Sequence, residues 1–139
     1  MKTLGTLHLM SVEGTGLRFE ARFPKFSYLL DSGPDATAAS PVVQLLGAIG
    51  ACAAMDVISI LRKKRLEITA YEVEMEAERA ETHPKRLTSV ALVHRVTGRS
   101  VPIEALEEAV RLSAERYCSV RHTLDPNLPL TDRCEVVEG

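Results

Sequence analysis

The stretch that decides the fold is Ser40–Val57, which reads SPVVQLLGAIGACAAMDV. Ser40 is a good N-cap, Pro41 suits the first helical position, and the cations of Arg62–Arg65 match the negative end of a helix dipole. The residues between these signals are apolar or small on nearly every side, which is typical of a helix enclosed by other structure. We therefore expect a core helix from Pro41 to about Lys64. A chain of 139 residues rarely surrounds such a helix alone, so the pattern favours a dimer.

The segments before this helix alternate as strands do. Leu4–Met10 and Leu17–Phe23 are separated by a turn at Gly14–Gly16, and the second segment carries Arg18 and Arg22 on its polar face. A third short strand is expected at Phe26–Leu30, before a loop that leads into the helix.

The segments after the helix predict a hairpin, a second helix and a last strand. Tyr71–Glu78 alternates with a strict period of two, and the basic residues of Leu87–Val96 complement its glutamates as cross-strand neighbours would. Pro102 opens a one-sided helix that reaches Tyr117, and a final strand is expected at Leu130–Val137. The prediction is an α+β fold in a single domain, residues 1–139.

Composition excludes several classes of function. A net charge of −2, with three Tyr, three Phe and no Trp, offers neither the basic surface nor the stacking platform of a nucleic-acid-binding protein. The longest uninterrupted apolar run, Leu45–Met55, is about half of the ~20 residues that cross a bilayer. The first residues contain no apolar segment typical of a secretion signal, so we expect a cytoplasmic protein without membrane contact. Three cysteines indicate individual reduced thiols rather than a disulfide scaffold.

Two cysteines occupy the settings that a redox pair requires. Cys52 lies within the apolar helix, and Cys118 ends the second helix. Cys52 is roughly three turns from the helix N-terminus, too far for the dipole to stabilise a thiolate, and Asp56 adds a negative charge one turn further on. A reactive Cys52 therefore needs a cation from elsewhere, and Arg18 and Arg22 are the best candidates.

Other interpretations of these residues stay open. Cys52 is also compatible with an inert, packed cysteine. A zinc site from Cys118, His122 and Cys134 would lack a fourth ligand and a close cysteine pair, so no metal and no cofactor is expected. Cys134, in the last strand, is interpreted as a small core residue.

The motifs together resemble one known family. The segments that carry the resemblance are Gly33-Pro34-Asp35, Ser40-Pro41 with Leu45-Leu46, Cys52-x-x-x-Asp56-Val57, and Tyr117-Cys118-Ser119-Val120. They resemble the OsmC/Ohr family of hydroperoxide-detoxifying proteins, from about Gly14 to the C-terminus. Ala77–Glu81 with Pro84-Lys85, and Leu112–Cys118, look most like its YhfA-like branch.

The resemblance implies a fold and an activity. In the family, antiparallel sheets from two intertwined chains wrap a central pair of apolar helices, so a homodimer is expected. In its peroxidase members the first cysteine reduces an organic hydroperoxide and becomes a sulfenic acid. The second cysteine then forms a disulfide with it, which a dithiol such as lipoamide reduces. Carried over, Cys52 is peroxidatic and Cys118 is resolving.

One position departs from the family pattern. Peroxidase members place a glutamate just after the motif proline, where it pairs with the activating arginine, whereas Pro41 is followed here by Val42. Asp56 is then the candidate carboxylate to hold that arginine. The leading expectation is a thiol peroxidase for oxidative stress defence, and the alternative is a redox sensor or apolar-ligand binding protein without turnover. A third possibility is an inert structural dimer.

Overall fold

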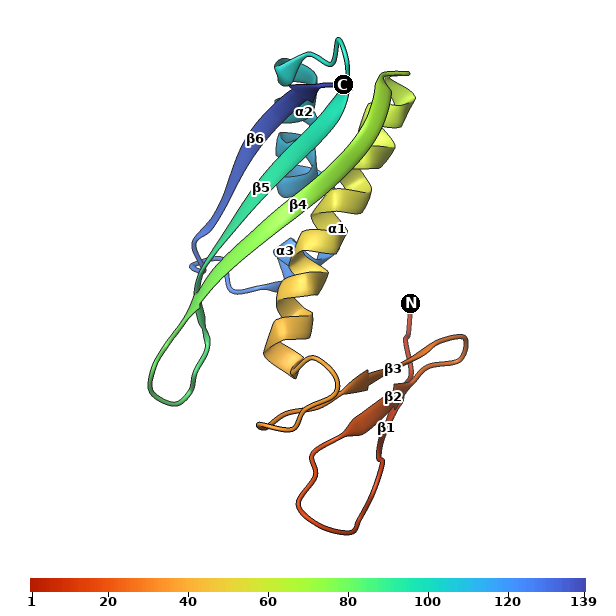
Figure 1. Ribbon diagram of the computed structural model, residues 1–139, viewed down its shortest axis with the longest axis vertical. Helices are drawn as coiled ribbons and strands as arrows, with labels where there is room; N and C mark the ends of the chain where they lie inside the picture. Colours follow the sequence, from red (N-terminus) through yellow and green to blue (C-terminus); the bar gives the residue numbers. More distant parts are fainter. The chain divides into compact units, whose positions relative to one another are not determined.

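The computed structural model describes residues 1–139, which form two compact units, Met1–Leu45 and Leu46–Gly139. Figure 1 shows a small sheet in the first unit and a longer sheet with helices in the second. The helix α1 (Pro41–Lys63) begins in one unit and continues through the other. Because the chain forms two compact units, a single domain over residues 1–139 stays a prediction.

The first unit is a three-stranded antiparallel sheet. Its strands are β1 (Thr6–Leu9), β2 (Phe19–Arg22) and β3 (Ser27–Leu30), in the order β1-β2-β3. All three lie within the segments predicted to be strands. Gly14 has a φ of 75° in the connection from β1 to β2, a conformation that glycine adopts without steric cost.

The second unit contains a sheet in the order β4-β5-β6, made of β4 (Glu67–Arg79), β5 (Leu87–Arg99) and β6 (Leu130–Glu138). The predicted hairpin of β4 and β5 is confirmed, and its strands are antiparallel. Glu72 lies opposite Arg95 and forms an ion pair with it, as the charge pattern indicated.

The strand β6 is parallel to β5, with Leu130 beside Val90 and Glu138 beside Gly98. The expectation of purely antiparallel sheets is therefore wrong for this unit. The physical reason is the long connection, because α2 (Ile103–Leu112), a π-helical turn η1 (Ser113–Tyr117) and α3 (Ser119–Thr123) return the chain to the end where β5 began. Parallel neighbours need such a crossover.

The helix α1 begins where the sequence predicted, and the side chain of Ser40 accepts a hydrogen bond from the Val43 amide at 3.4 Å. Its inner face repeats every four residues, as a helix that packs on a sheet requires. That face consists of Ile49, Ala53, Val57 and Leu61, each at most 2% exposed. Ile49 and Ala53 pack with Val90 and Leu92 of β5, whereas Val57 and Leu61 pack with Val96 and the helix α2.

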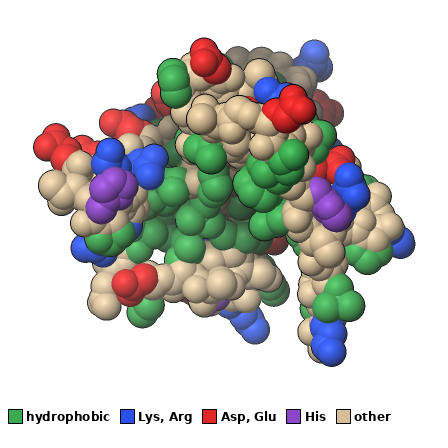
Figure 2. Space-filling view, turned by 90° about the horizontal axis from the view of Figure 1, so that it is seen from below, with side chains coloured by type: hydrophobic (Ala, Val, Ile, Leu, Met, Phe, Trp, Pro, Cys, Tyr) green, Lys and Arg blue, Asp and Glu red, His purple; other side chains and the backbone are tan.

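Several apolar residues on the remaining faces of α1 are not enclosed. Met55 is 69% exposed and Val43 is 53% exposed, and Figure 2 shows hydrophobic side chains open at the surface. By length and composition alone, the 23 residues of α1 could cross a membrane, although the uninterrupted apolar run within them is too short. Its inner face belongs to the core of the second unit. The prediction that a dimer pairs two copies of α1 inside its sheets is not tested by this single chain.

Candidate functional site

The structure brings Cys52, Asp56 and Cys118 together. Their two Sγ atoms and a carboxylate oxygen all lie within 4.8 Å of one another, and we call these three residues the thiol–carboxylate cluster. Cys52 and Asp56 are one turn apart on α1 and are half-buried, whereas Cys118 is fully buried. All three cysteines of the chain are free thiols. Residues far apart in the sequence thus form one compact group.

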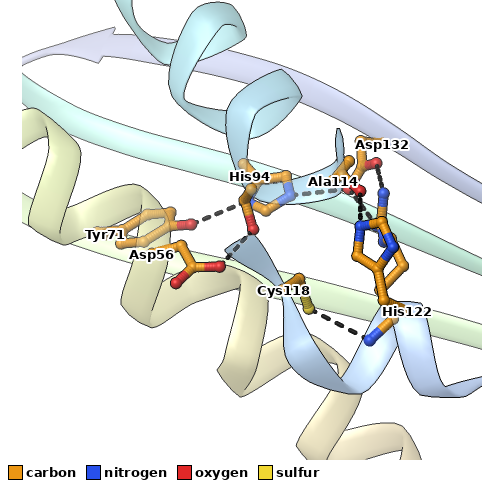
Figure 3. Close-up of polar contacts among 9 residues, drawn as sticks. Asp56, Tyr71, His94, Ala114, Cys118, His122 and Asp132 are labelled. Carbon is orange, nitrogen blue, oxygen red and sulfur yellow. Dashed lines mark hydrogen bonds and ion pairs between the residues drawn. The ribbon is translucent and has the colours of Figure 1, made fainter. Parts of the chain in front are cut away.

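The π-helical turn η1 places Cys118 beside α1. The Cys118 amide donates to the Ser113 carbonyl at 2.8 Å, which closes the wider turn. The Ser113 hydroxyl donates to Asp56 Oδ2 at 2.9 Å and so ties the start of this turn to α1 (Figure 3). Single π-helical turns are frequent at functional sites because they displace the residues that follow. Sequence patterns gave no indication of this turn.

Burial raises the pKa of the Cys118 thiol. A hydrogen bond from the Arg121 amide to Cys118 Sγ, 3.4 Å long, acts in the opposite direction, and the neighbouring Cys52 raises the pKa again. The net result is a pKa above the ordinary value. Cys118 is therefore a protonated thiol at neutral pH. A protonated thiol is a weaker nucleophile than a thiolate.

A buried polar network lies next to Cys118 and joins Tyr71, His94, Asp132 and Arg121 (Figure 3). Arg121 donates two hydrogen bonds to the Asp132 carboxylate, at 2.8 and 3.0 Å. His94, which is fully buried, contacts Asp132 through Nε2 at 3.1 Å and Tyr71 through Nδ1 at 2.8 Å. The network connects all three strands of the second sheet to the residue that hydrogen-bonds Cys118.

The acceptor-only carboxylate fixes the direction of one of these hydrogen bonds. Asp132 only accepts, so His94 Nε2 donates to it, and in the neutral imidazole Nδ1 then accepts from the Tyr71 hydroxyl. Burial raises the pKa of Tyr71, which keeps that hydroxyl protonated. Burial alone would raise the pKa of Asp132, but hydrogen bonds from His94 and Arg121, together with the positive charge of Arg121, outweigh it and hold that pKa below 3.8.

Sequence patterns predicted no role for His94, Asp132 or Arg121. One signal was available, because the alternation of Leu92, His94 and Val96 places the histidine on the core face of β5. A buried histidine needs a hydrogen-bond partner. The partner Asp132 could not be found in the same way, because its position depends on β6 running parallel to β5.

The two predicted arginines both lie in the first unit. Arg18 Nε donates to Asp31 Oδ2 at 3.3 Å, and Arg22 pairs with Glu20. Asp31 is only 6% exposed, and hydrogen bonds from the Thr37 and Ser32 amides, followed by Arg18, hold the pKa of its carboxyl low. Arg18 thus has a fixed carboxylate partner that the sequence analysis missed. The role of Arg18 or Arg22 beside Cys52 stays a prediction.

The residues of the alternative zinc set have other surroundings. His122 Nε2 is 2.9 Å from the Ala114 carbonyl, and Cys118 lies with Cys52 and Asp56. Cys134 packs against the core that contains Val57. Burial, followed by the charges of Glu107 and Asp132, raises the pKa of Cys134 to about 11, which suits a packed and unreactive thiol.

Comparison with known proteins identifies the family. The model of the family described as OsmC-like protein matches residues 33–131, a range that contains the whole thiol–carboxylate cluster. The chain is also 41% identical over 109 residues to Protein YhfA of Escherichia coli K12, which covers 78% of this chain and 81% of YhfA. The chain belongs to the OsmC-like family.

Solved structures agree with this assignment. A hypothetical protein from Aquifex aeolicus VF5 superposes with a TM-score of 0.86 at 29% identity, covering 100% of this OsmC-like protein and 98% of the other chain. An organic hydroperoxide resistance protein OsmC from Legionella pneumophila superposes with a TM-score of 0.65 at 16% identity, over 99% and 97% of the two chains. At that identity the second likeness shows the fold alone.

Proposed function

We propose that this OsmC-like protein is a thiol-dependent peroxidase that reduces organic hydroperoxides, with Cys52 as the peroxidatic and Cys118 as the resolving cysteine. The observation that carries the proposal is the approach of the two Sγ atoms to within 4.8 Å, from different elements of the fold. The raised pKa of Cys118 supports the division of roles, because a resolving cysteine acts second. The name of the Legionella protein points to the same class of substrate.

The chemistry balances with one dithiol as reductant. The Cys52 thiolate attacks the terminal oxygen of the hydroperoxide, the O–O bond breaks, and the alkoxide takes a proton to leave as the alcohol. Cys52 is then a sulfenic acid, and the Cys118 thiol displaces its hydroxyl as water to form the disulfide. A dithiol such as lipoamide returns both cysteines to thiols and is itself oxidised to a disulfide.

The surroundings of Cys118 suit this second step. A disulfide needs the two sulfur atoms at about 2.05 Å, so the separation must shrink after Cys52 is oxidised. Cys118 lies between η1 and the five-residue helix α3, where a local change of backbone does not disturb the sheet. Hydrogen bonds hold Ser113 to Asp56 before this segment and Arg121 to Asp132 after Cys118.

The Arg18–Asp31 ion pair is relevant to the valine at position 42, where the family pattern has a glutamate. In peroxidase relatives a glutamate after the motif proline orients the activating arginine, and Val42 has no such group. Asp31 gives Arg18 a carboxylate partner in its place. The proposal is therefore that Arg18, or else Arg22, supplies the cation for Cys52, and that Asp56 helps to position it.

The active form is proposed to be a cytoplasmic homodimer. The side chains of Val43 and Met55 leave apolar surface on α1 that a single chain exposes to water. A second copy of α1 would cover it, in the arrangement that the family resemblance implies.

Steady-state turnover tests this function. Wild-type protein should consume cumene hydroperoxide with a dithiol as reductant, and Cys52→Ser should abolish that consumption because a hydroxyl is a far weaker nucleophile than a thiolate. Cys134→Ser is the matched control and should keep full turnover. Wild-type consumption no faster than that of Cys52→Ser would reject the enzyme, and a single oxidation without recycling would favour a redox sensor.

A further inference from the structure

The thiol–carboxylate cluster is also a set of metal ligands. Thiolate sulfur and carboxylate oxygen are both common zinc ligands, and Cys52 and Asp56 are spaced i and i+4, which puts them on one face of α1. The same spacing lets two side chains of one helix hold a single zinc ion in metalloproteases. Cys118 adds the third donor from a separate element. Three protein ligands of this kind leave one tetrahedral position for water.

The distances allow a metal with little movement. Zinc bonds of about 2.3 Å to sulfur and about 2.1 Å to oxygen place tetrahedral ligand atoms roughly 3.6 to 3.8 Å apart. The three donor atoms lie within 4.8 Å of one another, so closure requires shifts of about 1 Å or less. Rotation of the half-buried side chains of Cys52 and Asp56 on α1 provides such shifts.

The surroundings orient the carboxylate as a ligand. The Ser113 hydroxyl donates to Asp56 Oδ2 at 2.9 Å, and the carboxylate keeps further lone pairs on both oxygens for a metal. Hydrogen bonds of this kind fix the direction of metal-binding carboxylates. Within the second unit, Asp56 accepts a hydrogen bond from the neutral Ser113 hydroxyl, and the two thiols release their protons when they bind a metal ion.

The geometry points to a second activity: we infer that the reduced protein binds one zinc ion, or a similar thiophilic divalent ion, through Cys52, Asp56 and Cys118. Metal binding and hydroperoxide reduction then compete for the same two sulfur atoms. The disulfide form has neither thiolate, so oxidation of the pair abolishes the site and releases the ion without any change in its charge. The inference rests on the positions of the ligands and not on peroxidase turnover.

Cobalt(II) titration of the reduced protein without oxygen or hydroperoxide tests the site, because thiolate ligands give cobalt a strong charge-transfer absorption. Wild-type protein should bind one cobalt ion per chain, and zinc should displace it. Cys52→Ser and Cys118→Ser should each weaken binding more than about 100-fold, and Ser113→Ala by about tenfold, because outer partners of metal ligands contribute 10- to 100-fold. Cys134→Ser should bind as the wild type does.

The disulfide form and a fold control complete the experiment. Protein oxidised with diamide should bind no cobalt, and circular dichroism should show that each variant is folded. Absence of thiolate–cobalt absorption in the wild type, equal affinity in wild type and Cys52→Ser, or loss of binding in Cys134→Ser would overturn the inference. These outcomes leave the peroxidase proposal untouched, and loss of turnover would leave the metal site untouched.

Discussion

Replacing Asp132 by asparagine tests whether the buried polar network supports the turn that carries Cys118. The change keeps the size of the side chain and removes the negative charge that faces both Arg121 and His94. The asparagine side chain would keep one acceptor oxygen and would direct an NH2 group at a donor that Asp132 now satisfies. Arg121, only 14% exposed, would lose its counter-charge.

The magnitude follows from the burial of the pair. Removing one partner of a buried ion pair costs about 3 to 5 kcal/mol, because the other charge stays buried without compensation. Asparagine retains one hydrogen bond, so the lower end, about 3 kcal/mol, is expected for Asp132→Asn. That loss lowers the ratio of folded to unfolded protein by about a hundredfold. The hydroxyl of Tyr71 stays available to His94 and limits further loss.

Urea denaturation at neutral pH measures the effect, with Asp35→Asn as the matched control because Asp35 is an exposed carboxylate. The control should unfold within about 0.5 kcal/mol of the wild type. An Asp132→Asn variant as stable as the control would refute the reasoning and show that the network contributes nothing to the fold.

The same carboxylate predicts a pH dependence with a definite sign. The pKa of Asp132 is lower in the folded protein than its ordinary value of 3.8, so its contribution is complete above that value. It is lost as the pH falls below 3.8 towards the folded-state pKa. The difference in stability between wild type and Asp132→Asn should therefore be constant near neutral pH and shrink in acid. A difference that grows in acid would contradict the assignment.

Three further predictions concern activation and assembly. Asp56→Asn should lower hydroperoxide turnover by an order of magnitude or more, which corresponds to about 1.4 kcal/mol in activation free energy. The reason is that a loosened arginine stabilises the thiolate and the substrate oxygens less well. An unchanged kcat/KM would show that Asp56 does not take part. Arg18→Ala or Arg22→Ala should have the same effect, and Asp31→Asn should follow Arg18→Ala if Arg18 is the cation; full activity in both arginine variants would place the cation elsewhere. Sedimentation should find a dimer at low micromolar concentration, because separation would expose the apolar surface of α1, and a stable, folded monomer would contradict it.

Elements with local signals could be predicted from the sequence. The start of α1 follows from Ser40 and Pro41, and the hairpin of β4 and β5 follows from strict alternation and opposite charges. These patterns act over a few residues, so they do not depend on the rest of the chain. The direction of β6 depends on where the crossover α2–η1–α3 ends, and alternation within β6 is the same in either direction.

The candidate site divides in the same way. Cys52, Asp56 and Cys118 were selected from the motifs and the family resemblance, and the structure brings them together. The Ser113 hydroxyl donates the hydrogen bond that holds Asp56. The sequence did not point to Ser113, because a π-helical turn has no reliable sequence pattern. Asp31 was missed because its role depends on the loop that folds back over its carboxylate, with Thr37 donating to it.

The central claim, that Cys52 reacts first and Cys118 resolves it, is tested most directly by intact-protein mass after one equivalent of organic hydroperoxide. Wild-type protein should lose two hydrogen atoms, and peptide mapping should join Cys52 to Cys118. Cys118→Ser should gain one oxygen atom on Cys52. Cys52→Ser should keep its mass. An oxygen gained on Cys118 in Cys52→Ser at the wild-type rate, or a wild-type disulfide that includes Cys134, would contradict the account.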